Sequence, residues 1–312
     1  MRLMVTGAAG FIGRPLVRHF GGLGWTVIRG VRFPGNDNHA EHPDAHTVRV
    51  DQDTGHFDIC DRVDAVVHLA GIAHVHGVDA EEFRNANAIW TQNLARRAAA
   101  LRIPRFIFVS TVKVAGDSHP DPIDENAPFE PNDFYASSKA TAEAMLEEVG
   151  RQSELRIITI RPPLVYGPDV KANFLSLLRL VDSGWPLPLA SVRNRRSLVY
   201  VGNLVSAIEA CVTHPIAANR TFFVSDDHDV SMPQLVEAIA AALGKRPRLF
   251  PFPPRLLQCI GHVGGRGEQM ARLTESLQVN ISRIKTEIGW RPPFSLQQGL
   301  TETVSWYRTQ SR

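Results

Sequence analysis

The chain has 312 residues, of which 44% are hydrophobic and 21% charged, with 34 Lys and Arg against 32 Asp and Glu. This near balance lacks the basic excess of a nucleic-acid binder, and no run approaches the ~18 apolar residues of a membrane-spanning helix. Cys60, Cys211 and Cys259 lie far apart, so neither a disulfide framework nor a structural zinc site is expected. The strand-like start at Arg2 leaves no room for a signal peptide, and we expect a cytoplasmic protein without stable membrane insertion.

The first half of the chain alternates short apolar runs, rich in β-branched residues, with longer helical stretches. Continuous apolar strands separated by helices are typical of a parallel sheet covered on both faces. We therefore predict an α/β fold with a doubly wound parallel sheet of the Rossmann type. The predicted strands are 3–6, 26–31, 47–50, 65–69, 106–110 and 156–160, and the predicted helices are 11–21, 80–101 and 136–151.

A second region begins after Arg161-Pro162-Pro163, where loops and prolines become frequent. The runs 197–201 and 221–224 look like strands that return to the main sheet, with a helix over 204–214 between them. We predict a dinucleotide-binding domain over 1–165 with a returning segment 196–225. A smaller, discontinuous α/β substrate-binding region then comprises 166–195 and 226–312.

A glycine-rich turn, Thr6-Gly7-Ala8-Ala9-Gly10-Phe11-Ile12-Gly13, follows the first strand and opens the first helix. Glycines allow the backbone to approach a pyrophosphate closely, and the helix N-terminus presents free N–H groups. The motif therefore predicts a dinucleotide site. The second strand lacks the terminal acid that usually binds a ribose 2′-OH and runs into Arg32, which favours NADP(H) over NAD(H).

Tyr135 and Lys139 stand four residues apart at the start of a predicted helix. This spacing puts them on one face, so the ammonium can lie near the phenol. Lowering a phenol's pKa from about 10 to about 7 takes roughly 4 kcal/mol of differential stabilisation. Taken alone, such a spacing far more often marks an exposed Tyr and Lys at a helix start.

Five motifs in order resemble the extended short-chain dehydrogenase/reductase family over essentially the whole chain: the glycine turn, His68-Leu69-Ala70-Gly71, Ser110-Thr111, Tyr135-x-x-x-Lys139 and Arg161 to Pro168. The resemblance implies Thr111, Tyr135 and Lys139 as catalytic residues, with Tyr135 as the acid/base. It also implies a cofactor site of Gly7, Gly10, Phe11, Ile12, Gly13, Arg32, Asp51, Gln52, Leu69, Ala70, Gly71, Asn87, Tyr135, Lys139 and Pro162.

Val112-Lys113 follow Thr111 where the family's sugar-nucleotide dehydratases carry Asp-Glu, which argues against dehydration. Four segments look most like a bacterial group proposed to reduce UDP-4-keto-6-deoxy-N-acetylhexosamines: 108–114, 170–175, 194–199 and 276–280. The resemblance therefore implies NAD(P)H-dependent reduction of the C4 keto group of such a UDP-sugar, for surface-polysaccharide precursors. The alternative is a UDP-hexose 4-epimerase with tightly bound NAD.

Contacts to a UDP-sugar are expected from Thr111, Lys113, Tyr135, Asn173, Leu187, Arg196 and Arg272. Asn173 matches the family's diphosphate-binding asparagine, whereas Arg196 lacks the acid that follows it in many relatives. Arg272 fits a phosphate or a solvated surface equally well. His68, His74 and His76 complete no ligand pattern, so no metal is predicted. A homodimer through the helices at 80–101 and 136–151 would be usual for the family.

Overall fold

The computed structural model describes residues 1–31, 46–51, 53–58, 62–73, 77–263 and 267–310. Within them, seven parallel strands form one sheet in the order β3-β2-β1-β4-β5-β6-β9. The predicted doubly wound Rossmann fold is therefore confirmed. The strands are β1 (Arg2–Thr6), β2 (Thr26–Val31), β3 (His46–Arg49), β4 (Ala65–His68), β5 (Arg105–Val109), β6 (Arg156–Arg161) and β9 (Arg220–Phe223).

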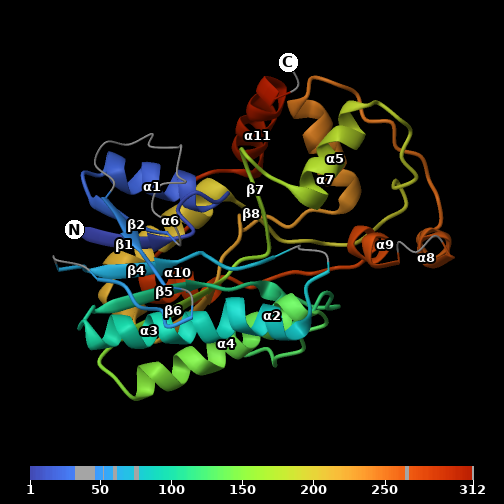
Figure 1. The fold of residues 1–312 in the computed structure, drawn as a ribbon. Coiled ribbons are helices and arrows are strands. Elements are labelled where there is room, and N and C mark those ends of the chain that lie inside the picture. Colours follow the sequence, from blue (N-terminus) through green and yellow to red (C-terminus); the bar gives the residue numbers. More distant parts are fainter. Residues whose placement is uncertain (32–45, 52, 59–61, 74–76, 264–266, 311–312) are drawn as a thin grey trace.

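Helices cover both faces of the sheet because successive strand residues point to opposite sides. Leu3 and Val5 join one buried cluster with α1 and α6, whereas Met4 joins another with α3 and α4. Figure 1 shows these two groups on either side of the strands. One face carries α1 (Gly13–Gly22), α6 (Val201–Thr213) and α10 (Ser282–Ile288), and the other carries α2 (Ala80–Arg84), a π-helical turn η1 (Asn85–Ile89), α3 (Trp90–Ala100) and α4 (Phe134–Arg151).

The strand predicted at 197–201 does not return to the main sheet, and that prediction was wrong. It forms β8 (Leu198–Tyr200), which pairs in parallel with β7 (Leu164–Tyr166) in a separate two-stranded sheet. The physical reason is that β9 already fills the place beside β6, with Ile160 opposite Phe222. The Pro162-Pro163 pair interrupts the chain between β6 and β7, since proline donates no ladder hydrogen bond.

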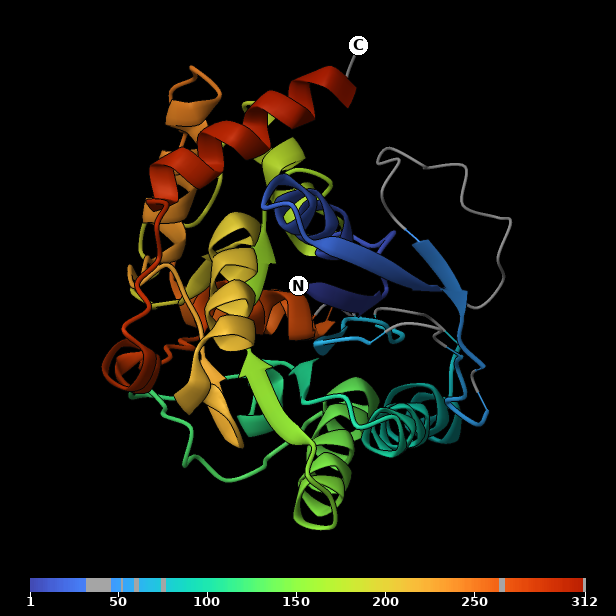
Figure 2. The same ribbon diagram turned by 90° about the vertical axis from the view of Figure 1, so that its left-hand side faces the viewer.

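The remaining helices surround a second buried cluster that includes Phe174, Leu178, Val236, Ile239 and Leu300. Both views place α11 on the far side of the molecule from α3 and α4 (Figures 1 and 2). These helices are α5 (Ala172–Asp182), α7 (Met232–Ala242), α8 (Pro254–Val263), α9 (Gly267–Thr274) and α11 (Leu296–Gln310), and the short 3₁₀ helices are η2 (Val112–Ala115) and η3 (Pro215–Ala217).

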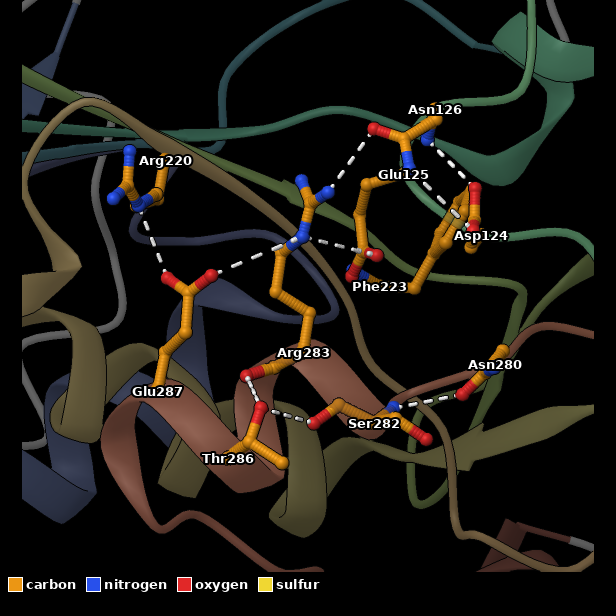
Figure 3. A network of polar contacts seen from close by, with 10 residues as sticks. All are labelled: Asp124, Glu125, Asn126, Arg220, Phe223, Asn280, Ser282, Arg283, Thr286 and Glu287. Carbon is orange, nitrogen blue, oxygen red and sulfur yellow. Dashed lines mark hydrogen bonds and ion pairs between the residues drawn. The ribbon is translucent and has the colours of Figure 1, made fainter.

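A polar network ties α10 to the main sheet (Figure 3). The buried carboxylate of Glu125 accepts a hydrogen bond from the N–H of Phe223 at 2.9 Å, and its other oxygen lies 3.6 Å from Nε of Arg283. Arg220 of β9 pairs with Glu287 of α10 at 3.0 Å. The loop after η2, the edge strand and the C-terminal part of the chain are thus held together.

Candidate active site

The glycine turn is packed against the end of β4. Gly7 has a φ of 72°, and a Cβ added there would lie 2.8 Å from the N atom of Ala70. A Cβ on Gly13 would lie 2.1 Å from the O atom of Gly7, while the N–H of Gly10 donates to that same oxygen at 3.0 Å. The structure therefore brings Gly7, Gly10, Gly13 and Ala70 together at the carboxyl edge of the sheet, where α1 opens directly after Phe11 and Ile12.

His68 lies fully buried directly beneath this turn. Its Nδ1 is 2.6 Å from Oγ1 of Thr6, and its Nε2 is 2.8 Å from Oγ1 of Thr91. Thr91 donates its only hydroxyl proton to the O atom of Asn87 at 2.6 Å, so Nε2 of His68 must donate to Thr91 and Nδ1 must accept from Thr6. Burial, with a smaller contribution from the charge of Lys139, lowers the pKa of His68 to about 3. The His68 ring is therefore uncharged, and its two nitrogens connect β4 to β1 and to α3 through hydrogen bonds.

Asn87 fastens the segment after β4 to the helix that carries Tyr135. Its Oδ1 accepts from the N–H of Ile72 at 2.8 Å, and its Nδ2 donates to the O atom of Ile72 at 2.9 Å and to Oγ of Ser138 at 3.0 Å. A Cβ on Gly71 would lie 2.7 Å from Oδ1 of Asn87. Asn87 thus supports the backbone at Ala70 and Gly71, and its direct contact with a cofactor stays a prediction.

The three predicted catalytic residues come from two neighbouring segments. Thr111 follows β5 and caps η2, and Asp133 caps α4 by accepting from the N–H of Ala136 at 2.6 Å. Tyr135 consequently lies in the first turn of α4, where its phenol hydrogen-bonds with the Thr111 side chain. Lys139 lies one turn further on.

The ammonium of Lys139 is directed at the sheet. Its Nζ donates to the O atom of Val109 at 2.8 Å and lies 4.2 Å from the centre of the Phe108 ring. The side chain is buried, and burial lowers the pKa of Lys139 to about 7, against the charge of Glu143, which raises it. Glu143 itself is held by Arg161 at 2.6 Å and by the hydroxyl of Ser110.

Burial raises the pKa of Tyr135 to about 12, and the negative charge of Asp133 adds to the rise, while the hydrogen bond with Thr111 opposes it. The phenol is therefore protonated at neutral pH and can act as an acid. This proton lies beside a threonine hydroxyl at the edge of the sheet where ligands of such folds bind. The arrangement suits protonation of an oxygen that gains negative charge.

Of four other predicted cofactor residues, the structure describes two, and the other two lie outside the described residues. The O atom of Pro162 accepts from the N–H of Val112 at 2.9 Å and so fixes the start of η2. Oδ1 of Asp51 accepts from the N–H and hydroxyl of Thr54 within its own turn, and these bonds lower the pKa of Asp51. Arg32 and Gln52 lie outside the described residues.

The predicted substrate residues are spread over two parts of the chain. Lys113 lies on η2 beside Thr111, and Asn173 is exposed at the start of α5. Leu187 is buried in the second cluster, and Arg196 forms bridges with Val230 and Leu277 while its Nη1 donates to the O atom of Glu275 at 3.1 Å. Arg272 belongs to α9, and its side chain lies outside the described part.

Sequence reasoning missed Asp133, Glu143 and Arg161 as parts of this site. Asp133 stands three residues before Ala136, which is the spacing of a helix N-cap and was a usable signal. Glu143 follows Lys139 by one helical turn, but nothing local predicts its pairing with Arg161 across to β6. Among the described residues, His, Cys, Asp and Glu form no group that could hold a metal ion, and no helix is long and apolar enough to cross a membrane.

A parallel doubly wound sheet with a glycine turn and a Tyr/Lys helix at its carboxyl edge defines a Rossmann protein of the dehydrogenase/reductase class. The sequence profile of the NAD dependent epimerase/dehydratase family matches residues 3–224. A UDP-glucose 4-epimerase of Vibrio cholerae is 38% identical, covering 97% of this chain and 94% of the relative. A dTDP-glucose 4,6-dehydratase of Streptomyces niveus is 29% identical, covering 99% and 93%.

The chain therefore belongs to the NAD dependent epimerase/dehydratase family. Among solved structures, the UDP-glucuronic acid 4-epimerase of Bacillus cereus in complex with NAD matches with a TM-score of 0.79 over 100% of both chains at 19% identity. This likeness supports the fold. The predicted resemblance is thus confirmed for the family, whereas the 4-reductase subgroup belongs to the proposal below.

Proposed function

We propose that the protein catalyses hydride transfer between a nicotinamide dinucleotide and C4 of a UDP-linked sugar, working as a reductase of a UDP-4-keto-6-deoxy-N-acetylhexosamine. The observation that carries this proposal is a protonated Tyr135 hydrogen-bonded with Thr111 at the sheet edge that also holds the glycine turn. The nucleotide-sugar substrate is supported by the activities for which the relatives from Vibrio cholerae and Streptomyces niveus are named.

In this proposal each of the three catalytic residues has a separate role. A nicotinamide cofactor, when bound, supplies the hydride that reaches C4. Tyr135 gives its proton to O4 as negative charge develops there, and Thr111 orients the same oxygen. Lys139, whose Nζ donates to the O atom of Val109, would contact a cofactor ribose.

Dehydration is disfavoured by the side chain two positions after Thr111. Lys113 is a cation there and forms ion pairs with Asp117 at 3.2 Å and with Asp133. Elimination of the C6 hydroxyl needs a base for the C5 proton, and an ammonium held by two carboxylates is a poor base. This separates the chain from the dehydratases to which it is similar.

The cofactor and the direction of reaction depend on different observations. β2 ends on Val31 without a carboxylate, and Arg32 follows it, which supports NADP(H) and a released, reduced cofactor. The family description and the NAD-bound structural relative support NAD(H). A 4-epimerase is the second candidate, because the 38% identical relative from Vibrio cholerae carries that name.

One assay separates the two candidates. The purified protein is mixed with NADPH and a UDP-4-keto-6-deoxy-N-acetylhexosamine made in place by a 4,6-dehydratase, and NADPH absorbance is followed. We expect NADPH consumption only when the keto sugar is present, with UDP-glucose and UDP-galactose left unchanged. Interconversion of those two sugars without added cofactor, and no NADPH consumption, would instead establish an epimerase.

A further inference from the structure

Lys113 occupies an ion-paired position between two carboxylates beside Tyr135. Its Nζ lies 3.2 Å from Oδ1 of Asp117 and in close contact with Oδ2 of Asp133, and only 20% of its side chain is exposed. Asp133 uses its other oxygen to cap α4, where it accepts from the N–H of Ala136 at 2.6 Å. One carboxylate therefore serves both the lysine and the helix.

This ion pair joins the two segments that carry the reacting side chains. Lys113 stands two residues after Thr111, whose Oγ1 accepts from the Lys113 N–H at 3.3 Å. Asp133 stands two residues before Tyr135. The ion pair thus bridges η2 and the start of α4, in addition to the hydrogen bond that the N–H of Glu130 donates to the O atom of Val114 at 2.9 Å.

The charges around Tyr135 make the ion pair electrostatically important. Asp133 opposes ionisation of the phenol, because a second negative charge nearby disfavours a phenolate. On α4, the ammonium of Lys139 is held at the Val109 carbonyl, and Glu143 is paired with Arg161. On η2 and the loop after it, Lys113 pairs with Asp117, and the loop also carries His119, Asp121, Asp124, Glu125 and Glu130. Lys113 is a cation that pairs directly with Asp133.

We propose that Lys113 is a positioning residue that neutralises Asp133, and thereby governs both the proton affinity of Tyr135 and its placement against Thr111. This inference rests on the proposed function in one respect, because it takes Tyr135 as the proton donor. It also reassigns Lys113, which the sequence suggested as a direct substrate contact.

The test is a titration of Tyr135 in four proteins: Lys113→Arg, Lys113→Met, and each of these combined with Asp133→Asn. Arginine keeps its charge at the alkaline pH where this phenol titrates, whereas a lysine ammonium is largely lost there. A stopped-flow pH jump records phenolate absorbance before alkaline unfolding, and subtraction of a Tyr135→Phe protein isolates the signal. We expect the pKa of Tyr135 to be about one unit higher in Lys113→Met than in Lys113→Arg, because the guanidinium neutralises Asp133. In the Asp133→Asn background, this difference should largely vanish.

Two controls separate charge from structure. Asparagine can still cap a helix, so Asp133→Asn keeps α4 in place. Circular dichroism spectra of Lys113→Arg and Lys113→Met at neutral pH should match that of the wild type, which guards against a folding defect in either variant. Asp117→Asn is the matched control, because Asp117 contacts Lys113 without capping α4, and it should shift the Tyr135 titration much less than Asp133→Asn.

The inference is overturned if Lys113→Met and Lys113→Arg titrate alike, or if the difference between them persists undiminished when Asp133 is already Asn. The titration needs no sugar substrate, so its outcome is independent of the reaction proposed above. If Lys113 and Asp133 are coupled but the protein has no ketoreductase activity, the proposed function is wrong and the inference stands. If the protein is an active reductase without this coupling, the inference is wrong and the proposed function stands.

Discussion

Tyr135 is the residue on which the proposed chemistry depends. Its phenol, with a pKa near 12, is protonated at neutral pH and hydrogen-bonds with Thr111. Tyr135→Phe removes the acid but little volume, so kcat should fall by about 10²–10⁴-fold while cofactor affinity stays within about twofold. Steady-state kinetics and a cofactor-binding titration check this.

Tyr307→Phe is the matched control for that variant. Its hydroxyl contacts Asp182 at 3.2 Å in the second region, away from Thr111 and Lys139, so it should keep the wild-type kcat. A Tyr135→Phe enzyme that retained most of its activity would exclude the phenol as the proton donor.

The residues proposed to carry the chemistry could be identified from the sequence, whereas their partners could not. Thr111 ends a strand, and Tyr135 and Lys139 share a helix face, so local patterns reveal them. The burial of Lys139 against Phe108 and the pairing of Glu143 with Arg161 depend on how α4 packs on β5 and β6. No local pattern encodes those distances.

At the level of elements, the first helix and its turn depend on a glycine that nothing larger can replace. A Cβ on Gly13 would lie 2.1 Å from the O atom of Gly7. Gly13→Ala should therefore displace the turn, weaken cofactor binding at least about tenfold and lower Tm, because backbone must move to relieve the overlap. Binding titration and thermal unfolding measure both effects.

Gly21, near the end of the same helix, is the control for Gly13. A Cβ there would meet nothing within 4 Å. Gly21→Ala should leave binding unchanged and stabilise the fold by up to about 1 kcal/mol, since alanine favours helix. Equal losses in the two variants would mean that the turn is not sterically constrained.

His68 links β1, β4 and α3, and it gives stability a pH dependence. Its pKa is lowered from 6.5 to about 3, so the folded state binds fewer protons than the unfolded state between these values. Its contribution is fully present above pH 6.5 and is lost as the pH falls toward 3, by at most about 1.4 kcal/mol per pH unit.

Urea unfolding at several pH values across that window measures the slope. Carboxylates also contribute to the change of unfolding free energy with pH, so the wild type is compared with His68→Gln. In the variant, this slope should be smaller by up to the contribution of one bound proton. Identical slopes in the two proteins would show that His68 accepts no proton on unfolding.

On the scale of the whole molecule, Arg283 secures the C-terminal part to the sheet through Glu125. Because only 2% of the Glu125 side chain is exposed, Arg283→Gln would leave a buried charge without its cation and cost about 1–3 kcal/mol in unfolding free energy. Burial raises the pKa of Glu125, so the loss should be largest above that pKa and shrink as acid protonates the carboxylate.

Arg151→Gln provides the comparison on the surface. Arg151 pairs with Glu147 and Glu148 but is 62% exposed, so its loss should change stability much less than the loss of Arg283. Denaturant unfolding measures the unfolding free energy of both variants. A smaller decrease for Arg283→Gln than for Arg151→Gln would contradict a structural role for the buried pair.

Alternating strands and helices predicted the fold class, but not where β8 pairs. β9 occupies the edge of the sheet beside β6, and β8 pairs with β7 instead. This pairing depends on segments far apart in the sequence. The division at residues 165, 195 and 225 and the homodimer through α2 to α4 stay proposals. The same holds for the NADP(H) preference inferred from Arg32, for which a titration with both cofactors, before and after Arg32→Asp, is the test.

Isotope transfer follows the proposed hydride directly. The protein is given NADPH deuterated at the pro-S position of C4, together with the UDP-4-keto-6-deoxy-N-acetylhexosamine, and the product is analysed by mass spectrometry and NMR. We expect one deuterium at C4 of the sugar and oxidised cofactor in equal amount. A reduced sugar without deuterium would contradict transfer of the pro-S hydride, which the resemblance to extended short-chain dehydrogenases/reductases implies. Recovery of unreduced keto sugar beside unconsumed NADPH would contradict the reductase itself.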